Sequence, residues 1–263
     1  MKRAGFLFLL LSFFLHLSLQ GQSPYHLNWK RELSYVGVGA PILGVGMHLK
    51  ANVNSLSRSD LIGMNRRYVA GFDRAATFQS SAISADWSDH FLLGSHVLPA
   101  LFLANKTTRS DFGKIAVLYG EVFLITSGFT YLSKGLVQRP RPYVYNEVFD
   151  EGSKMSQTAL FSFFSGHTAE TAANCFFAAK VFADYFPDSK WKPVVWGLAA
   201  TIPAATGYFR YAAGKHYPSD ILVGYAVGAF VGVMVPHWHK KPGQKRDISF
   251  YPGMGGGALV WRF

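Results

Sequence analysis

Six apolar segments of similar length recur along this 263-residue chain and limit the folds that it can adopt. Their lengths and their alanine, leucine and phenylalanine content favour helices over strands, although glycine and valine weaken the assignment for the first and last. Such helices bury their apolar faces against one another, which predicts an all-α fold, a bundle of about six helices. The segments are residues 34–49, 91–104, 115–133, 167–186, 193–209 and 221–236.

The small proportion of charged residues raises the question of a membrane. Asp, Glu, Lys and Arg make up 16% of the chain, against about 25% in a typical soluble protein. A membrane span needs about 20 apolar residues, and most of these segments are shorter. The segments at residues 115–133, 193–209 and 221–236 lack Lys and Arg and could cross. We expect a membrane-embedded bundle; the alternative is a soluble bundle whose short helices pack only against one another.

The segment at residues 167–186 differs from the others because it carries three charged side chains: Glu170, Lys180 and Asp184. Charged groups are unfavourable in lipid unless they face protein or the membrane interface. The same segment holds Cys175, the single cysteine of the chain, so no intrachain disulfide can form. We expect Cys175 to be a small core residue.

The two ends of the chain differ in character from its middle. Residues 1–21 have a basic start followed by an apolar stretch, which predicts a signal peptide cleaved near Gly21, with an uncleaved anchor as the alternative. Residues 22–89 form an N-terminal extension with one apolar segment, residues 90–236 a helical core, and residues 237–263 a basic tail.

Within the tail, partial alternation on both sides of a glycine-rich turn predicts a short β-hairpin. His237 and His239 precede it, and we expect them to belong to a solvated or interfacial tail with at most adventitious metal binding. Two polar stretches, residues 50–90 and 143–160, interrupt the apolar pattern and are predicted to be loops or surface helices.

Three clusters of basic, histidine and small residues lie between the apolar segments and together have the composition of a phosphate site. They contribute Lys134, Arg139 and Arg141 in KGLVQRPRP, Ser165, Gly166 and His167 in FFSGHTAE, and Arg210, His216 and Asp220 in FRYAAGKHYPSD. Arginine binds phosphate oxygens with a planar fork and lysine with a point charge. A Ser-Gly pair at a helix start turns backbone N–H groups toward an anion. A carboxylate four residues after a histidine can hold one ring nitrogen protonated and leave the other as nucleophile or base.

If consecutive helices run antiparallel, all three clusters lie at one end of the bundle. The turn at residues 186–193 and the tail from residue 235 then lie at the other end, which is rich in lysine, and the positive-inside rule makes that end cytoplasmic. If instead residue 22 is exported and all six segments cross, the three clusters lie on the cytoplasmic side. The glycine-rich segment at residues 34–49 is the weakest candidate span.

Together the clusters resemble the signature of the phosphatidic acid phosphatase type 2 superfamily, which also includes bacterial acid phosphatases and vanadium haloperoxidases. That signature is Lys, six residues, Arg-Pro; then Pro-Ser-Gly-His; then Ser-Arg, five residues, His, three residues, Asp. The resemblance covers roughly residues 90–236 and retains every one of these short spacings. Two positions depart from it, because Phe164 stands where Pro is usual and Phe209 where Ser is usual. The first removes rigidity from the anion loop and the second removes a hydroxyl near phosphate.

The resemblance implies a phosphatase that needs no metal or other cofactor. His216 is then the nucleophile that becomes a phosphohistidine, Asp220 orients it, and His167 protonates the leaving alcohol and later activates water. The resemblance assigns phosphate binding to Lys134, Arg141, Arg210, Ser165 and Gly166. Arg139 is a candidate supporting residue outside this set.

The choice of substrate follows less directly. A membrane-embedded bundle with an outward site suggests a lipid phosphate, such as a phosphatidic acid, a polyprenyl pyrophosphate or a lipid A phosphate, in the bacterial cell envelope with the site facing the periplasm. The alternatives are a soluble periplasmic acid phosphatase of broad specificity and a non-catalytic envelope protein that binds phosphate or lipid. The net charge of +11 suits anionic lipid or phosphate. Nucleic acid is not an expected partner, because the cations are scattered and no nucleic-acid-binding module accompanies them.

Overall fold

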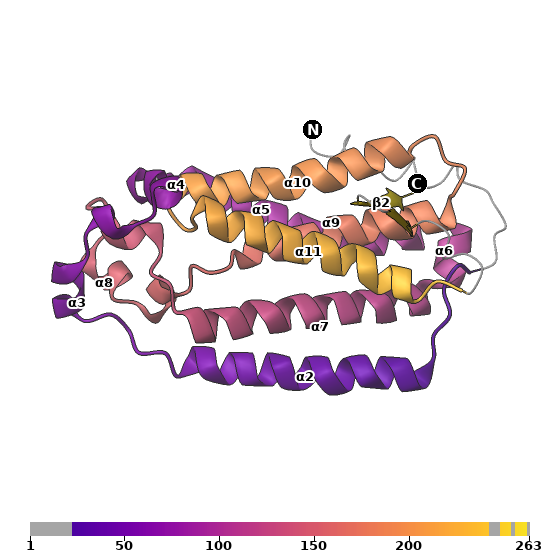
Figure 1. Cartoon of the computed structure of the whole chain (residues 1–263), viewed down its shortest axis with the longest axis horizontal. Coiled ribbons are helices and arrows are strands. Elements are labelled where there is room, and N and C mark those ends of the chain that lie inside the picture. Colours follow the sequence, from indigo (N-terminus) through magenta and orange to yellow (C-terminus); the bar gives the residue numbers. More distant parts are fainter. Residues whose placement is uncertain (1–22, 242–247, 254–255, 262–263) are drawn as a thin grey trace.

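The computed structural model describes residues 23–241, 248–253 and 256–261, and the predicted leader, residues 1–21, lies outside them. Six long helices lie side by side along the long axis of the molecule (Figure 1), which confirms the predicted all-α bundle. They are α2 (Trp29–Ala51), α5 (Ala82–Val97), α7 (Phe112–Val137), α9 (Gly166–Tyr185), α10 (Lys192–Ala212) and α11 (Pro218–Trp238). Five of the predicted apolar segments each lie within one of these helices or overrun it by a single residue.

The remaining segment, residues 91–104, is divided between two elements. Helix α5 begins much earlier, inside the polar stretch, where the Ser81 side chain accepts a hydrogen bond from the Ser84 amide and caps the first turn. It ends at Val97 and is followed by the 3-10 helix η3 (Leu98–Leu103), in which Pro99 has no N–H to continue the α-helical ladder. The predicted domain boundary after residue 89 therefore falls inside a helix.

Short helices cover one end of the bundle. They belong to residues 52–81 and 138–165, which we call the cap, and they coincide with most of the two polar stretches (Figure 1). The cap elements are α3 (Arg58–Gly63), η1 (Arg66–Tyr68), α4 (Gly71–Arg74), η2 (Ala75–Phe78), η4 (Pro142–Tyr145), α8 (Glu151–Lys154) and η5 (Gln157–Leu160). The opposite end, which includes α6 (Lys106–Ser110) and the turn between α9 and α10, is the far end.

Consecutive long helices alternate in direction, so that α2, α7 and α10 end at the cap while α5, α9 and α11 begin there (Figure 1). Helices α2 and α7 are consequently parallel, and they pack against each other. Helix α9 occupies the centre, in contact with α5, α7, α10 and α11, and 14 of its 20 residues are buried. Cys175 is among them, as expected for a core residue. Residues at the start of α9 therefore lie where five long helices meet the cap.

The charged residues of α9 face protein. The Lys180 ammonium lies 2.7 Å from the Asp184 carboxylate, and both side chains are buried. Asp184 also accepts a hydrogen bond from the Tyr25 hydroxyl and pairs with Lys240 at 3.0 Å. Lys180 and Asp184 therefore face protein, as charged residues in an apolar segment must if the segment lies in a membrane.

Glycines allow the helices to approach closely. A Cβ atom added at Gly228 in α11 would lie 2.0 Å from the carbonyl oxygen of Ala169 in α9, and a Cβ at Gly46 in α2 would lie 2.5 Å from the Leu132 amide nitrogen in α7. Backbones at such distances leave no room for a side chain, and small residues at helix interfaces are common in membrane bundles.

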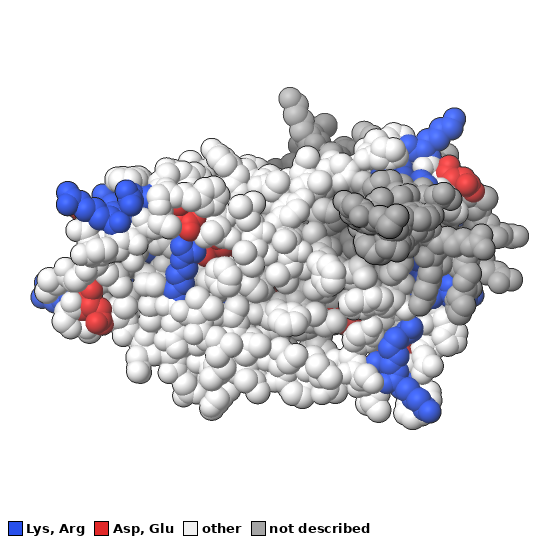
Figure 2. Space-filling view, viewed as in Figure 1, with Lys and Arg blue, Asp and Glu red and all other residues white. Residues whose placement is uncertain are grey.

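The outer surface of the bundle is apolar. On the face in Figure 2 the charged residues gather near the two ends, and a broad belt between them carries almost none. Large apolar side chains are exposed on the outer helices, for example Val36, Val45, Phe123, Phe129 and Phe230. Among the described helices, α7 and α11 are long and apolar enough to cross a membrane. Buried helices of soluble proteins can have the same length and composition, so these properties support membrane association only weakly.

Near the C-terminus the strands β1 (Ile248–Gly253) and β2 (Gly256–Trp261) pair antiparallel, with Ile248 opposite Trp261, in agreement with the predicted hairpin. In the described part of the predicted tail, His239 and Lys240 are not solvated. His239 is fully buried, its carbonyl accepts a hydrogen bond from the His26 amide at 2.9 Å, and Tyr25 and Lys240 form a β-bridge. The prediction of a solvated or interfacial tail is wrong for His239, because its ring lies against Glu32 and Tyr35 of α2 and Glu121 of α7.

Candidate active site

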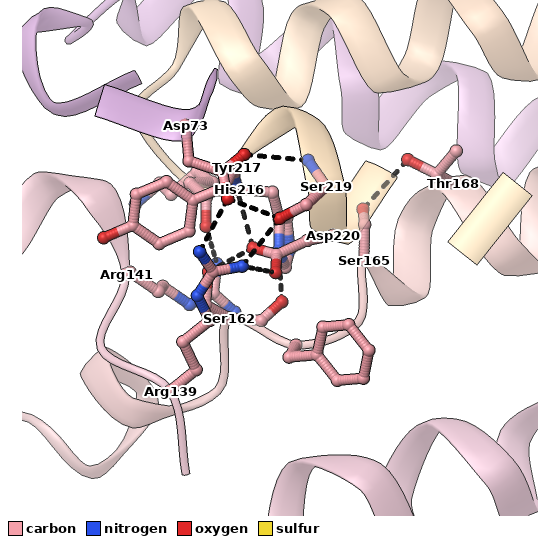
Figure 3. A network of polar contacts seen from close by, with 12 residues as sticks. Asp73, Arg139, Arg141, Ser162, Ser165, Thr168, His216, Tyr217, Ser219 and Asp220 are labelled. Carbon is pink, nitrogen blue, oxygen red and sulfur yellow. Dashed lines mark hydrogen bonds and ion pairs between the residues drawn. The ribbon is translucent and has the colours of Figure 1, made fainter. Parts of the chain in front are cut away.

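All three sequence clusters lie at the cap end. Lys134 is in the last turn of α7, Arg210 is in the last turn of α10, and Asp220 is in the first turn of α11. Ser165 and Gly166 begin α9, and His216 lies in the short connection between α10 and α11. Part of the resulting network is drawn in Figure 3.

His216 is held by the cap rather than by Asp220. The imidazole is 1% exposed, and its Nδ1 lies 2.7 Å from the carbonyl oxygen of Ser162. Because a carbonyl only accepts, Nδ1 carries the proton and Nε2 keeps its lone pair. The nearest Asp220 oxygen is 3.8 Å from Nδ1, too far for the hydrogen bond that the sequence spacing suggested.

Asp220 is fully buried and is occupied by other donors. It accepts hydrogen bonds from the Ser162 hydroxyl at 2.5 Å and from the Tyr217 amide at 3.0 Å. The second of these caps the first turn of α11, where Pro218 occupies the first helical position. Ser162 thus contacts His216 through its carbonyl and Asp220 through its hydroxyl, and the carboxylate acts on the histidine through this residue.

Arg139 connects Asp220 to a second buried carboxylate. Its guanidinium lies 2.5 Å from Asp220 and 2.8 Å from Asp73, and it stacks 4.0 Å above the Tyr217 ring (Figure 3). Asp73 also accepts hydrogen bonds from the amide and hydroxyl of Ser219. The planar fork of arginine suits two carboxylates at once, which a lysine could not reproduce.

His167 has a carboxylate partner from α5. Its Nε2 lies 2.7 Å from Asp89, which is also 3.6 Å from the Arg210 guanidinium. Arg210 in turn donates a hydrogen bond to the Ser88 hydroxyl at 3.2 Å. The histidine is partly exposed, with 28% of its side chain accessible, so it lies where the buried site meets solvent.

The basic residues of the clusters leave positive charge incompletely compensated. Arg141 donates to the carbonyls of Thr158 and Lys215, which are neutral acceptors. The buried Nε of Arg210 has no hydrogen-bond acceptor among the described residues. Such buried donors favour an anionic ligand.

The start of α9 offers further donors. The Ser165 side chain bonds the Thr168 hydroxyl and caps none of the first-turn N–H groups, while the Ser165 amide itself donates to the Asp220 carbonyl. Uncapped N–H groups at a helix start bind anions well. A Cβ at Gly166 would lie 3.1 Å from the Lys134 ammonium nitrogen, so this lysine and the helix start converge. The resemblance assigns phosphate binding to Ser165, but in this structure its amide donates to the backbone carbonyl of Asp220.

These charges also act on His216. Burial, together with the positive charges of Arg141, Arg210 and Lys134, holds the pKa of His216 well below its usual range. The imidazole is therefore neutral at neutral pH, which is the form that can act as a nucleophile.

The two aromatic residues at positions where the signature has Pro and Ser occupy different surroundings. Phe164 is buried and lines an apolar cavity between α2, α7 and α11. Phe209 packs against Phe91 of α5, with ring centroids 5.6 Å apart. Neither substitution removes a charged group from the site.

Sequence reasoning missed Asp73, Asp89 and Ser162, three residues that contact predicted site residues. Asp89 would have been found if Ser81 had been read as a helix cap, because α5 then begins at the cap end. No local pattern marks Asp73 or Ser162, whose partners lie 146 and 58 residues away in sequence. Among the described residues one group of histidine and carboxylate side chains has metal-ligand spacing, and it lies at the far end.

A family model described as the PAP2 superfamily matches residues 115–244. The chain belongs to this superfamily. Membership in it indicates a phosphatase that acts on phosphate esters. No significant match to the chain was found among curated proteins or among solved structures.

Proposed function

We propose that this phosphatase works through a phosphohistidine on His216 and acts on a lipid phosphate. The observation that carries the chemistry is the buried, neutral His216, whose protonated Nδ1 is bonded to Ser162 and whose Nε2 is free to attack. Nε2 forms a bond to phosphorus while the bond from phosphorus to the leaving alcohol oxygen breaks. His167, oriented by Asp89, donates the proton that the alcohol takes up.

The second step reverses the roles. His167 removes a proton from water, the resulting oxygen attacks phosphorus, and the bond from phosphorus to Nε2 breaks to give inorganic phosphate. Throughout both steps Lys134, Arg141 and Arg210 hold the phosphoryl oxygens, with the uncapped N–H groups at the start of α9. Arg139 is a positioning residue, because it bonds Asp220 rather than the phosphate site.

The test is the variant His216→Ala with His48→Ala as control, since His48 is an exposed histidine of α2. We expect phosphate release to be abolished in the first variant and unchanged in the second, with both proteins keeping the melting temperature within a few degrees. Labelled substrate should trap an acid-labile phosphoprotein in the wild type only. Normal turnover by folded His216→Ala would exclude the mechanism.

Two reagents, vanadate and a chelator, test this mechanism against that of a metallophosphatase. Vanadate, which adopts the geometry of the transferring phosphoryl group, should inhibit, and a chelator should leave turnover unchanged. Loss of turnover in chelator by a chain that remains folded, restored by a divalent metal, would instead assign the reaction to a metal.

The apolar cavity supports a lipid substrate. It encloses about 750 Å³ and is lined almost wholly by apolar atoms, from Phe164 beside the α9 start to Trp238 near the far end. Along α11 it extends from Ala226 to Trp238, about 18 Å at the helical rise per residue. An acyl or prenyl chain fits this shape, because a headgroup phosphate at the α9 start places the attached chain next to Phe164.

The variant Ala226→Trp tests this assignment by filling the cavity, and Ala200→Trp, on α10 outside it, is the control. We expect the first to lower kcat/KM at least about tenfold for a long-chain phosphatidic acid and to leave p-nitrophenyl phosphate turnover unchanged. Equal use of both substrates by the wild type would favour the alternative, an acid phosphatase of broad specificity. Phosphate binding without any turnover would favour the other alternative, a non-catalytic envelope protein that binds phosphate or lipid.

We further propose that the bundle lies in the membrane of a bacterial cell envelope with the site facing the periplasm. The lysines at the far end, Lys190, Lys192, Lys240 and Lys241, favour a cytoplasmic far end. Tyr25 lies at the same end, because it pairs with Lys240, so export of this segment would predict the reverse. Since Cys175 is buried, single cysteines introduced at Lys154 and Lys190 report the two ends, and labelling of Lys190→Cys alone in intact cells would overturn this orientation.

A further inference from the structure

Three titratable side chains meet inside the far end, remote from the phosphatase site. Glu32 from the first turn of α2, Glu121 from α7 and His239 at the end of α11 place one ligand atom each within 4.8 Å of one another. The His239 Nε2 lies 3.2 Å from Glu32 and 3.2 Å from Glu121. We call these residues the far-end triad.

The far-end triad lacks a partner of positive charge at its centre. Both oxygens of the Glu121 carboxylate and the Nε2 of His239 are buried and have no hydrogen-bond partner among the described residues. The Glu121 side chain is 4% exposed and His239 is fully buried. A buried carboxylate without donors is strongly unfavourable, so this arrangement calls for a cation between the three groups.

The tautomer of His239 follows from its other nitrogen. Nδ1 lies 2.7 Å from the Val235 carbonyl and donates to it, so in the neutral imidazole Nε2 presents its lone pair toward the carboxylates. This is the orientation of a metal-binding histidine, whose second ring nitrogen usually donates to a carbonyl or carboxylate. Tyr35 stacks beside the ring, 5.6 Å between centroids, and holds it in place.

The triad keeps uncompensated negative charge that can bind a divalent cation. Arg31 pairs with Glu32 at 2.9 Å and compensates one of the two carboxylates, which leaves one negative charge within the group. Ligand atoms that bind one tetrahedral zinc at about 2.0–2.2 Å lie roughly 3.3 Å apart, close to the two 3.2 Å separations seen here. One imidazole with carboxylates favours zinc over magnesium or calcium, which prefer oxygen alone.

We propose that the far-end triad binds one Zn²⁺, with water as the fourth ligand, as a structural site separate from phosphate hydrolysis. Glu32 is the most accessible of the three ligands, with 16% of its side chain exposed, and gives the ion a path from solvent. The bound ion ties α2, α7 and the end of α11 together at the end opposite the phosphatase site.

The test measures zinc in the full chain, purified in detergent without a histidine tag, after addition of zinc and gel filtration. We expect about one zinc per chain in the wild type and less than about 0.1 in Glu121→Gln and His239→Gln. The controls Glu151→Gln and His48→Gln change exposed residues at the cap end and should keep the full amount. Zinc should raise the melting temperature of the wild type by about 5 °C and leave both triad variants unchanged.

A second measurement does not depend on the folding of variants. Co²⁺ added to the zinc-free wild type should give the visible absorption bands of a tetrahedral site, and stoichiometric zinc should remove them. Binding below about 0.1 equivalent by the wild type would overturn the proposal and assign the charge to a proton on His239. Equal loss of zinc in the control variants would overturn it as well.

Discussion

Replacing Arg139 with glutamine removes the cation shared by two buried carboxylates. Asp220 is fully buried and the Asp73 side chain is 5% exposed, whereas Arg139 itself is 26% exposed. Removing one partner of a buried ion pair costs about 3–5 kcal/mol. Water can partly replace the exposed part of the guanidinium, and Ser162, Tyr217 and Ser219 still donate to the carboxylates, so we expect about 2–3 kcal/mol.

This loss is measurable as a melting temperature. At roughly 2–4 °C per kcal/mol for a chain of this size, Arg139→Gln should melt about 4–12 °C below the wild type in detergent. Arg58→Gln is the matched control, because the Arg58 pair with Glu151 is largely exposed and should contribute less than about 1 kcal/mol.

A double-mutant cycle shows whether the effect comes from the carboxylates. With Asp73→Asn already present, Arg139→Gln leaves one buried charge fewer without compensation, so its cost should fall by about 1–2 kcal/mol. Melting temperatures of Arg139→Gln within about 1 °C of the wild type, or two changes that simply add, would refute this account of the network.

Three further changes have expected outcomes of different kinds. Gly228→Ala should destabilise by about 3 kcal/mol, because its Cβ would meet the Ala169 carbonyl, whereas Gly120→Ala, with open space around it, should be neutral or stabilising in thermal unfolding. Since the pKa of His216 is lowered on folding, the unfolded chain takes up a proton below about pH 6.5 that the folded chain does not, so His216 lowers stability as pH falls and contributes nothing above that range. The fall in the free energy of unfolding between pH 7.5 and 5, measured by denaturant unfolding, should therefore be smaller in His216→Gln, by at most about 2 kcal/mol. Asp89→Asn should lower kcat about 10- to 100-fold with little change in melting temperature, because it disorients His167 while 56% of the Asp89 side chain is already exposed; unchanged kcat would show that Asp89 is not needed.

The long helices and the meeting of the three clusters could be predicted from the sequence because both follow from local properties. Apolar length sets where a helix runs, and alternation of direction sets which helix ends share a side. Lys134, Gly166 and Asp220 each lie at a helix end, so their common location required no knowledge of packing.

The contacts within the site could not be predicted in the same way. Spacing placed Asp220 beside His216, but the Tyr217 amide and the Ser162 hydroxyl compete for the same carboxylate, and the Ser162 carbonyl takes the histidine. The burial of His239 depends on contacts with Glu32 and Tyr35, more than 200 positions earlier in the chain. Such competition between distant groups is decided by tertiary packing, which no local pattern encodes.

The central position of α9 divides the molecule into a part that is constrained and a part that can vary. Four neighbouring long helices fix α9, including a glycine contact in α11 that admits no side chain, so the reacting groups tolerate little change. The cap, by contrast, is made of short turns joined at the surface, many of whose side chains are exposed. Exchange of the exposed cap helices α3 and α8, which contain none of the site residues, should therefore alter access to the site while the same histidine continues to react.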